Sequence, residues 1–408
     1  MDKKVKRRVI ALGVLAFLLA VLGGGFYASK IISKSSTESG AGQNAVVRQE
    51  EKHHLTLDEQ VDEIVSSMST TEKIGQLLMI GVQGTTANED SLYVLHQFHY
   101  GGIILFDRNL ESKEQTKALV KDLQAGADEK LPLFIAIDEE GGLVVRGKNF
   151  IAAPPSQEKI GRTGEPKRAY QQAKDTAAEL KELGINVNFA PVADVGSGDE
   201  RSYSKEAYET LKFVKAAGDG YKEGGIFYAL KHFPGIGQGR VDSHKEISSI
   251  EASESELRRK DLVPFREMFN DTDKGRNLDY MVMVGHLNYP ALDADHPASL
   301  SKKIITELLR QNLGYEGIII TDDMEMGAIS NHQSFRQAGA AAILAGADIV
   351  LVCHEYKHAE DAYMGIYEAV KSGEISEERL AASVKRIVKA KLMHGLTPQG
   401  SNKRKDLN

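Results

Sequence analysis

Eight short apolar segments recur along the chain from residue 55 onward, and each is followed by a stretch with helical periodicity. Strands that are apolar throughout are typical of a parallel sheet with both faces covered by helices. Eight such units fit a closed barrel better than an open doubly wound sheet, so we predict an α/β fold, a single (β/α)8 TIM-type barrel. The predicted strands are Gln76–Val82, Gly102–Phe106, Leu133–Ile137, Asn186–Pro191, Phe227–Leu230, Tyr280–Val284, Gly317–Ile320 and Ala347–Val352.

Local sequence patterns mark the ends of several predicted helices. The segments Ser69–Glu72 and Ser112–Gln115 both match the capping box, in which a serine and a residue three positions later satisfy each other's backbone N–H groups. Gly184, Gly314 and Gly395 each follow a helical stretch, where a left-handed residue commonly closes a helix. These patterns place helices between the predicted strands.

The first 30 residues differ from the rest of the chain. A basic head that includes Lys3 and Arg8 precedes Val9–Ser29, a run of 21 residues without a charge. About 20 apolar residues span a bilayer, whereas the apolar part of a signal peptide usually has about 7–15. Phe26 and Tyr27 also stand where a cleavage site needs small residues. We therefore expect an uncleaved transmembrane anchor, with a cleaved signal peptide as the alternative, and in both cases an exported body.

Composition separates the remaining parts of the chain. Residues 31–54 are rich in Ser, Gly, Gln and charge, which predicts a flexible linker. The predicted organisation is thus an anchor over 1–30, a linker over 31–54, the barrel over 55–398 and a polar tail over 399–408. The formal charge is −7, and because the first 30 residues contribute +5, the rest of the chain stands at −12. Such an acidic body is a poor prospect for nucleic-acid binding, so no nucleic-acid partner is expected.

The sequence shows no pattern for a metal or a cofactor, and we expect neither. Gly235, Gly237 and Gly239 resemble a phosphate-binding loop only weakly, because no Lys-Ser or Lys-Thr pair follows them. Cys353 is the single cysteine, which excludes an intrachain disulfide. Its position deep in the chain excludes a lipoprotein anchor, and we predict a buried core thiol.

Polar residues follow six of the eight predicted strands directly. In a (β/α)8 barrel the carboxyl ends of the strands meet at one mouth, where catalytic groups gather. A site with so many carboxylate, imidazole and ammonium groups is suited to the hydroxyl groups of a sugar. The residues are Asp107 to Asn109, Asp138 to Glu140, Asp194, Lys231 with His232, His286, and Thr321 to Asp323.

Four longer segments closely resemble glycoside hydrolase family 3. They are DEEGGLVVR (Asp138–Arg146), INVNFAPVADV (Ile185–Val195), KHFPGIGQGRVDSH (Lys231–His244) and IITDDMEMGA (Ile319–Ala328). The resemblance covers roughly residues 55–398, and it is strongest to the bacterial β-N-acetylglucosaminidases that act on peptidoglycan fragments. It implies a retaining enzyme that releases terminal β-linked N-acetylglucosamine (GlcNAc), as in GlcNAc-MurNAc fragments, for cell-wall turnover or recycling.

The resemblance also implies catalytic roles. Asp322 corresponds to the nucleophile of the family, and a retaining glycosidase needs in addition a group that protonates the leaving oxygen. In this subgroup a histidine takes that role, and Asp242-Ser243-His244 matches its motif. A spacing of two in an extended segment puts Asp242 and His244 on the same side, so that the carboxylate can orient the imidazole as acid and base.

The remaining matches imply contacts with the sugar. Asp138 would accept hydrogen bonds from ring hydroxyls, while donors would come from Arg146, Arg201, Lys231 and His232. Asp194 and His286 also end strands, and either can belong to the site or only brace it. Met324 and Met326 are expected to pack in the core.

Two positions depart from the family pattern. Leu143 replaces a common arginine, and Ile236 replaces a polar residue between two loop glycines. Neither change removes a proposed catalytic group, but both put in doubt the contacts beyond the first sugar.

Two alternatives to a hydrolase remain open at this point. A phosphorylase on the same scaffold is one, because a neutral imidazole does not repel phosphate as a second carboxylate would. A non-catalytic wall-binding protein is the other, and loss of Asp322, Asp242 or His244 would favour it; all three are present. We expect a membrane-anchored enzyme with an extracellular catalytic part, a carbohydrate substrate and a monomeric state.

Overall fold

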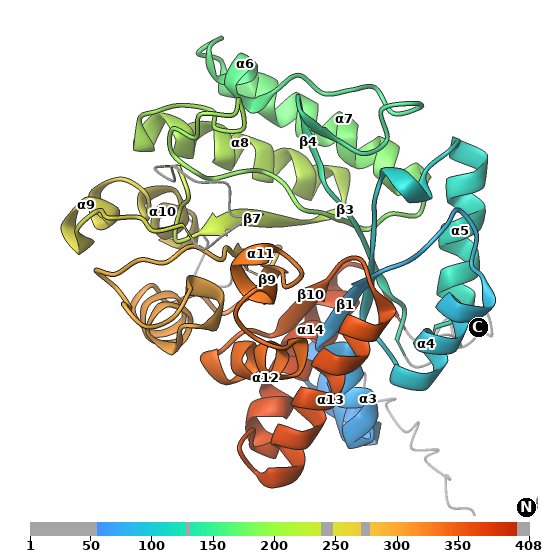
Figure 1. Cartoon of the computed structure of the whole chain (residues 1–408). Coiled ribbons are helices and arrows are strands. Elements are labelled where there is room, and N and C mark those ends of the chain that lie inside the picture. Colours follow the sequence, from blue (N-terminus) through green and yellow to red (C-terminus); the bar gives the residue numbers. More distant parts are fainter. Residues whose placement is uncertain (1–54, 128–130, 238–247, 271–277, 398–408) are drawn as a thin grey trace, which may run out of the picture. The chain divides into compact units, whose positions relative to one another are not determined.

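Eight parallel strands close into a barrel in the computed structural model, which describes residues 55–127, 131–237, 248–270 and 278–397 (Figure 1). The strands follow one another around the barrel in chain order, and Leu78 of the first strand pairs with Val350 of the last to close it. All eight predicted strands are present, so the (β/α)8 prediction is confirmed. They are β1 (Leu78–Gly81), β2 (Gly102–Leu105), β3 (Phe134–Ile137), β6 (Val187–Asn188), β7 (Phe227–Phe233), β8 (Tyr280–Val284), β9 (Ile319–Asp323) and β10 (Ile349–Val352).

Helices surround the barrel, and a short hairpin of β4 (Glu139–Gly141) and β5 (Val144–Val145) follows β3 at the barrel mouth. Figure 1 shows α7 and α8 lying side by side along one flank, and α12 and α13 along another. The helices are α2 (Leu57–Ser67), α3 (Thr70–Gln76), α4 (Glu89–Phe98), α5 (Lys113–Ala125), α6 (Gln157–Gly161), α7 (Pro166–Glu182), α8 (Ala207–Gly224), α9 (Glu254–Arg259), α10 (Val263–Asn270), the π-helical η3 (Lys303–Asn312), α11 (Gly327–Ser330), α12 (Phe335–Ala345), α13 (Tyr356–Ser372) and α14 (Glu377–Met393), with 3-10 turns η1 (Asp107–Asn109) and η2 (Ala298–Leu300).

The predicted helix ends are largely confirmed. Ser69 forms a complete capping box at the start of α3. Ser112 caps α5 by accepting the N–H of Gln115. The second half of the predicted capping box, a hydrogen bond from the Ser112 N–H to the Gln115 side chain, is wrong. The Gln115 side chain accepts the N–H of Glu111 at 2.9 Å and donates to the Asn109 carbonyl at 3.0 Å, so it is tied to the loop after β2. The predicted closing glycines are left-handed, with φ of 80° at Gly184, 70° at Gly314 and 76° at Gly395.

The core fills the barrel and the layer between strands and helices. Every residue of β1, β2, β3, β8 and β10 is buried, as expected of strands covered on both faces. Cys353 is 2% exposed, which confirms the buried thiol, and Met324 is 1% exposed and packs in the core as predicted.

Several predictions concern segments outside the described residues. These are the anchor over 1–30, the linker over 31–54, the tail over 399–408, and the 238–247 segment that carries Asp242 and His244. Within the described part of the chain, no helix has the length and apolar character needed to cross a bilayer.

Candidate active site

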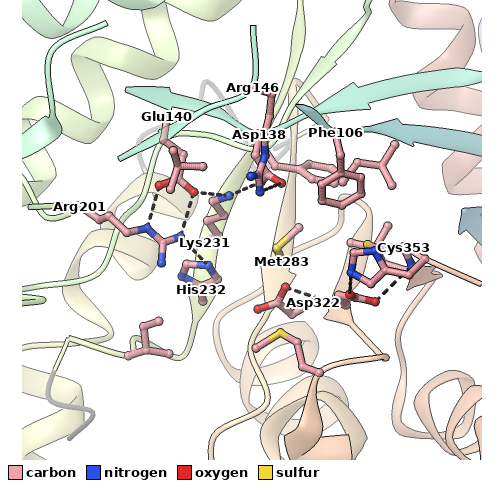
Figure 2. Close-up of a pocket in the computed structure, with 18 residues that line it drawn as sticks. Phe106, Asp138, Glu140, Arg146, Arg201, Lys231, His232, Met283, Asp322 and Cys353 are labelled. Atoms are coloured by element: carbon pink, nitrogen blue, oxygen red, sulfur yellow. Dashed lines mark hydrogen bonds and ion pairs between the residues drawn. The ribbon is translucent and has the colours of Figure 1, made fainter. Parts of the chain in front are cut away.

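A pocket of about 380 Å³ opens at the carboxyl ends of the barrel strands (Figure 2). Its lining comes from the ends of β2, β3, β6, β7, β8, β9 and β10, together with the β4–β5 hairpin and the loop before α8. The structure thus brings together all of the predicted site residues that it describes. These are Asp138, Arg146, Arg201, Lys231, His232 and Asp322.

Asp322 stands near the end of β9, where pairing with the neighbouring strands holds its backbone. Its Oδ1 accepts the N–H of Asp323 at 2.8 Å. Burial raises the pKa of the Asp322 carboxyl, but the neighbouring His232 and His286 imidazoles and the Asp323 N–H outweigh burial and hold it below its ordinary value. Asp322 is therefore an ionised carboxylate at neutral pH, the state that a carboxylate nucleophile needs.

His286 contacts the backbone at the end of β9 and does not line the pocket. Its Nε2 donates to the Asp323 carbonyl at 2.8 Å, and its Nδ1 lies 2.7 Å from the Ser299 hydroxyl. Because a carbonyl only accepts, Nε2 carries a proton, and in the neutral ring Nδ1 then accepts from the Ser299 hydroxyl. Burial also lowers the pKa of His286, which favours this neutral form. His286 thus braces the strand that carries Asp322.

Lys231 and His232 both face the pocket although they are consecutive in β7. The register between β7 and β8 shifts between Lys231 and Phe233, which breaks the usual alternation of side chains. His232 Nδ1 lies 2.8 Å from Asp194 Oδ2, and Asp194 Oδ1 accepts the N–H of Ile236 at 2.9 Å. Asp194 is 1% exposed and outside the pocket lining, so it braces His232, whose Nε2 lies 3.4 Å from Arg201 Nη2 at the pocket.

Arg146 reaches the pocket from the loop after β5. Its Nη2 lies 3.6 Å from Asp138 Oδ2 and its Nη1 lies 3.4 Å from Asp107 Oδ1. The guanidinium carbon is 5.2 Å from the centre of the Phe106 ring, a cation–π contact. Phe106 also lines the pocket, and Arg108 packs 4.6 Å from its ring centre. Phe106 ends a predicted strand, but its place in the site was not predicted.

Glu140 lines the pocket, and sequence reasoning placed it at the barrel mouth but gave it no role in the site (Figure 2). It forms ion pairs with Arg201 and Lys231. Burial raises the pKa of Glu140, but the charges of Lys231 and Arg201 outweigh burial and hold it well below its ordinary value. The signal was present, since Glu140 lies in the DEEGG segment two residues after Asp138, but nothing in that segment names its partners.

Apolar side chains complete the pocket wall. The apolar part of the wall includes Ile236, Met283, Met326 and Cys353. The prediction that Met326 packs in the core is wrong, because the turn between β9 and α11 leaves this side chain half-buried at the pocket. Of the two departures from the family pattern, Ile236 lines the pocket, whereas Leu143 is 76% exposed at the tip of the β4–β5 hairpin.

Close packing holds the segment that leads toward the predicted acid/base residues. A Cβ atom at Gly237 would lie 2.1 Å from the Val195 carbonyl oxygen, so only glycine fits there. Asp242 and His244 follow in the segment outside the described residues, and their roles stay predictions. Among the residues that the structure describes, no three His, Cys, Asp or Glu side chains form a group that could hold a metal ion.

A barrel mouth with an ionised carboxylate, surrounded by charged donors and acceptors, defines a TIM-barrel enzyme with a site for a polyhydroxylated ligand. The sequence model described as Glycosyl hydrolase family 3 N terminal domain matches residues 69–390. The chain therefore belongs to glycoside hydrolase family 3, which confirms the resemblance found in the sequence and makes the protein a glycoside hydrolase.

Similar proteins support the same group within the family. The chain is 32% identical to beta-hexosaminidase A of Pseudoalteromonas piscicida, over 79% of this chain and 61% of that protein. It is 36% identical to a beta-hexosaminidase of Tolumonas auensis, over 68% of this chain and 82% of that protein. The structure of a family 3 beta-N-acetylglucosaminidase from Paenibacillus sp. str. FPU-7 superposes with a TM-score of 0.77 at 36% identity, over 81% of this chain and 63% of that one. The first and third matches thus span less than two thirds of the relatives' own lengths.

Proposed function

We propose that the protein is a retaining exo-β-N-acetylglucosaminidase that hydrolyses terminal β-linked GlcNAc from peptidoglycan fragments of the GlcNAc-MurNAc type. The observation that carries the proposal is the ionised Asp322 carboxylate at the mouth of β9, inside a pocket ringed by hydrogen-bonding side chains. The names of the relatives, beta-hexosaminidase and beta-N-acetylglucosaminidase, support the choice of sugar.

The pocket favours removal of one terminal sugar at a time. Ligand sites commonly measure about 300–1,000 Å³, and this one, at about 380 Å³, is at the small end of that range. Asp138 would accept hydrogen bonds from ring hydroxyls, while Lys231, Arg201 and Arg146 would donate to the ring oxygens and the acetamido group. His232 would face the sugar through Nε2, since Asp194 holds its other nitrogen.

The proposed reaction proceeds through a glycosyl-aspartate intermediate. The Asp322 carboxylate attacks the anomeric carbon as the glycosidic bond breaks, and His244 gives its proton to the leaving oxygen. The same imidazole then takes a proton from the water that attacks the anomeric carbon and releases Asp322. Asp242 orients the ring and stabilises its protonated form. The product keeps the β configuration.

We also propose that residues 1–30 anchor the protein in the cell membrane, with the barrel outside the cell. The basic head and the 21-residue uncharged run support this arrangement. A substrate derived from the cell wall is compatible with it.

Aryl β-glycosides of GlcNAc and of glucose test the proposal directly, each with and without phosphate. Hydrolysis of the GlcNAc glycoside alone, with free GlcNAc as the product in both buffers, is expected. A sugar 1-phosphate would identify a phosphorylase, and preference for glucose would contradict the assigned substrate. A mechanism-based fluorinated sugar tests the nucleophile separately. It should label Asp322 covalently, and a label on Asp323 or Glu325 would contradict the assignment of Asp322 as the nucleophile.

A further inference from the structure

Glu140 lies in the pocket wall and contacts two neighbouring cations, Arg201 and Lys231 (Figure 2). Its side chain is 2% exposed. Its Oε2 accepts Arg201 Nε at 2.8 Å, and its Oε1 accepts both Arg201 Nη2 at 2.9 Å and Lys231 Nζ at 2.6 Å. We propose that Glu140 is a positioning residue of the sugar site, which fixes the geometry and charge of Lys231 and Arg201. This inference rests on the proposed function, because it concerns how the same pocket holds the sugar.

The first argument is the distribution of hydrogen-bond donors. An ammonium group has three N–H donors, and Lys231 directs two of them to Asp138 Oδ1 at 2.7 Å and Glu140 Oε1 at 2.6 Å. The third is left for a ligand. Arg201 directs its Nε and Nη2 groups to Glu140, and Nη2 also lies 3.4 Å from His232 Nε2. Its Nη1 remains, 3.7 Å from Asp199 Oδ2. Glu140 therefore decides which donors of both cations remain for a sugar.

The second argument is linkage between separate elements. Lys231 belongs to β7, whereas Arg201 belongs to the loop between β6 and α8. Glu140 reaches both from β4, and the shared Oε1 atom holds the two cations side by side. A guanidinium bound through two parallel N–H groups also has a fixed plane, which a single contact would not impose.

The third argument is the energy of a buried charge. The Lys231 side chain is 3% exposed, and a buried ammonium is costly unless it is paired. Asp138 pairs with it too, but Asp138 also lies 3.6 Å from Arg146. Burial lowers the pKa of Lys231, whereas the charges of Asp138 and Glu140 raise it above its ordinary value. Removal of the Glu140 charge must therefore lower the pKa of Lys231.

The neighbouring Glu139 offers a matched control. It is also buried, at 1% exposure, but it does not line the pocket. Its Oε2 accepts the backbone N–H groups of Arg146 at 3.0 Å and Gly147 at 3.2 Å. Glu139→Gln keeps an acceptor oxygen for those groups and changes no contact of Lys231 or Arg201.

Kinetics on an aryl β-glycoside of GlcNAc provide the first test. Glu140→Gln is expected to lower kcat/KM by about 100- to 1,000-fold, the scale of losing one partner of a buried ion pair. Most of the loss should be in KM, because these cations bind parts of the sugar that do not react. The alkaline limb of the kcat/KM profile should move to lower pH. Glu140→Asp keeps the charge with a shorter reach, so it should restore the alkaline limb but not the full affinity, while Glu139→Gln should leave both near wild type.

Chemical labelling of Lys231 provides a second test that needs no turnover. Acylation by acetic anhydride is followed across pH by peptide mass spectrometry, because only the neutral amine reacts. In Glu140→Gln the pH at which Lys231 becomes reactive should fall, and in Glu140→Asp and Glu139→Gln it should stay near that of wild type. A midpoint that does not move in Glu140→Gln, or an unchanged KM and alkaline limb, would overturn the inference. If wild type does not cleave GlcNAc glycosides, the proposed function fails, and the labelling result still decides whether Glu140 controls Lys231.

Discussion

Replacement of Glu139 by glutamine is expected to stabilise the protein at high pH and to change its stability little at low pH. Glu139 is 1% exposed, and its Oε1 has no hydrogen-bond partner in the described part of the chain. Burial raises the pKa of Glu139 from 4.5 to about 7, although the N–H groups of Gly147 and Arg146 oppose the shift. The folded protein thus holds a proton that the unfolded chain releases above pH 4.5.

The sign and size of the effect follow from this difference in pKa. Between pH 4.5 and about 7 the folded state binds more protons than the unfolded state, so stability falls as pH rises. At about 1.4 kcal/mol for each pH unit, the loss reaches about 3 kcal/mol at pH 8 and stays below about 1 kcal/mol at pH 5. Glutamine has the shape of the protonated glutamate and cannot ionise, so Glu139→Gln removes the loss.

Thermal unfolding at pH 5 and pH 8, followed by circular dichroism, measures the effect. At about 2 °C for each kcal/mol in a domain of this size, the variant should unfold roughly 5 °C above wild type at pH 8 and close to wild type at pH 5. Glu374→Gln, at an exposed position after α13, is the control and should show no gap at either pH. A gap at pH 8 that is absent, reversed or equal to that of the control would refute the reasoning.

Three further predictions test the proposed chemistry and location. Asp322→Ala should abolish turnover while leaving the unfolding temperature close to that of wild type, since it removes a nucleophile and no core contact. His244→Ala should lose about 100- to 10,000-fold on GlcNAc-MurNAc but far less on the dinitrophenyl glycoside, whose leaving group hardly needs a proton; Asp242→Ala should lose less in the same direction, and an equal loss on both substrates would mean that His244 only shapes the pocket. The full-length protein should partition with membranes, and a version that begins near Leu55 should be soluble and fully active; recovery of most native protein from the medium, starting near residue 30, would indicate a cleaved signal peptide instead.

Sequence reasoning was sufficient for the barrel and for most of the described pocket. The eight apolar runs are local patterns, and parallel strands covered by helices are the arrangement that buries them on both faces. Once a barrel is predicted, the residue after each strand must lie at its mouth, which is why Asp138, Lys231 and Asp322 were found without coordinates. The family motifs added Arg146 and Arg201, which the strand pattern does not predict because they lie several residues beyond a predicted strand end.

Tertiary structure decided which charges meet. Glu139 and Glu140 are adjacent and identical in the sequence. Glu139 is a buried carboxyl that accepts two backbone N–H groups and has a raised pKa, whereas Glu140 is an ionised partner of two cations. The difference arises because the side chains of consecutive residues in β4 point to opposite faces, one away from the pocket and one toward Arg201 and Lys231. Those partners lie 61 and 91 residues further along the chain, where no local pattern records them. Electrostatic energy depends on the distances between charges and on their burial. Both are set by the closed barrel, so only the tertiary structure determines the protonation state and partners of each glutamate.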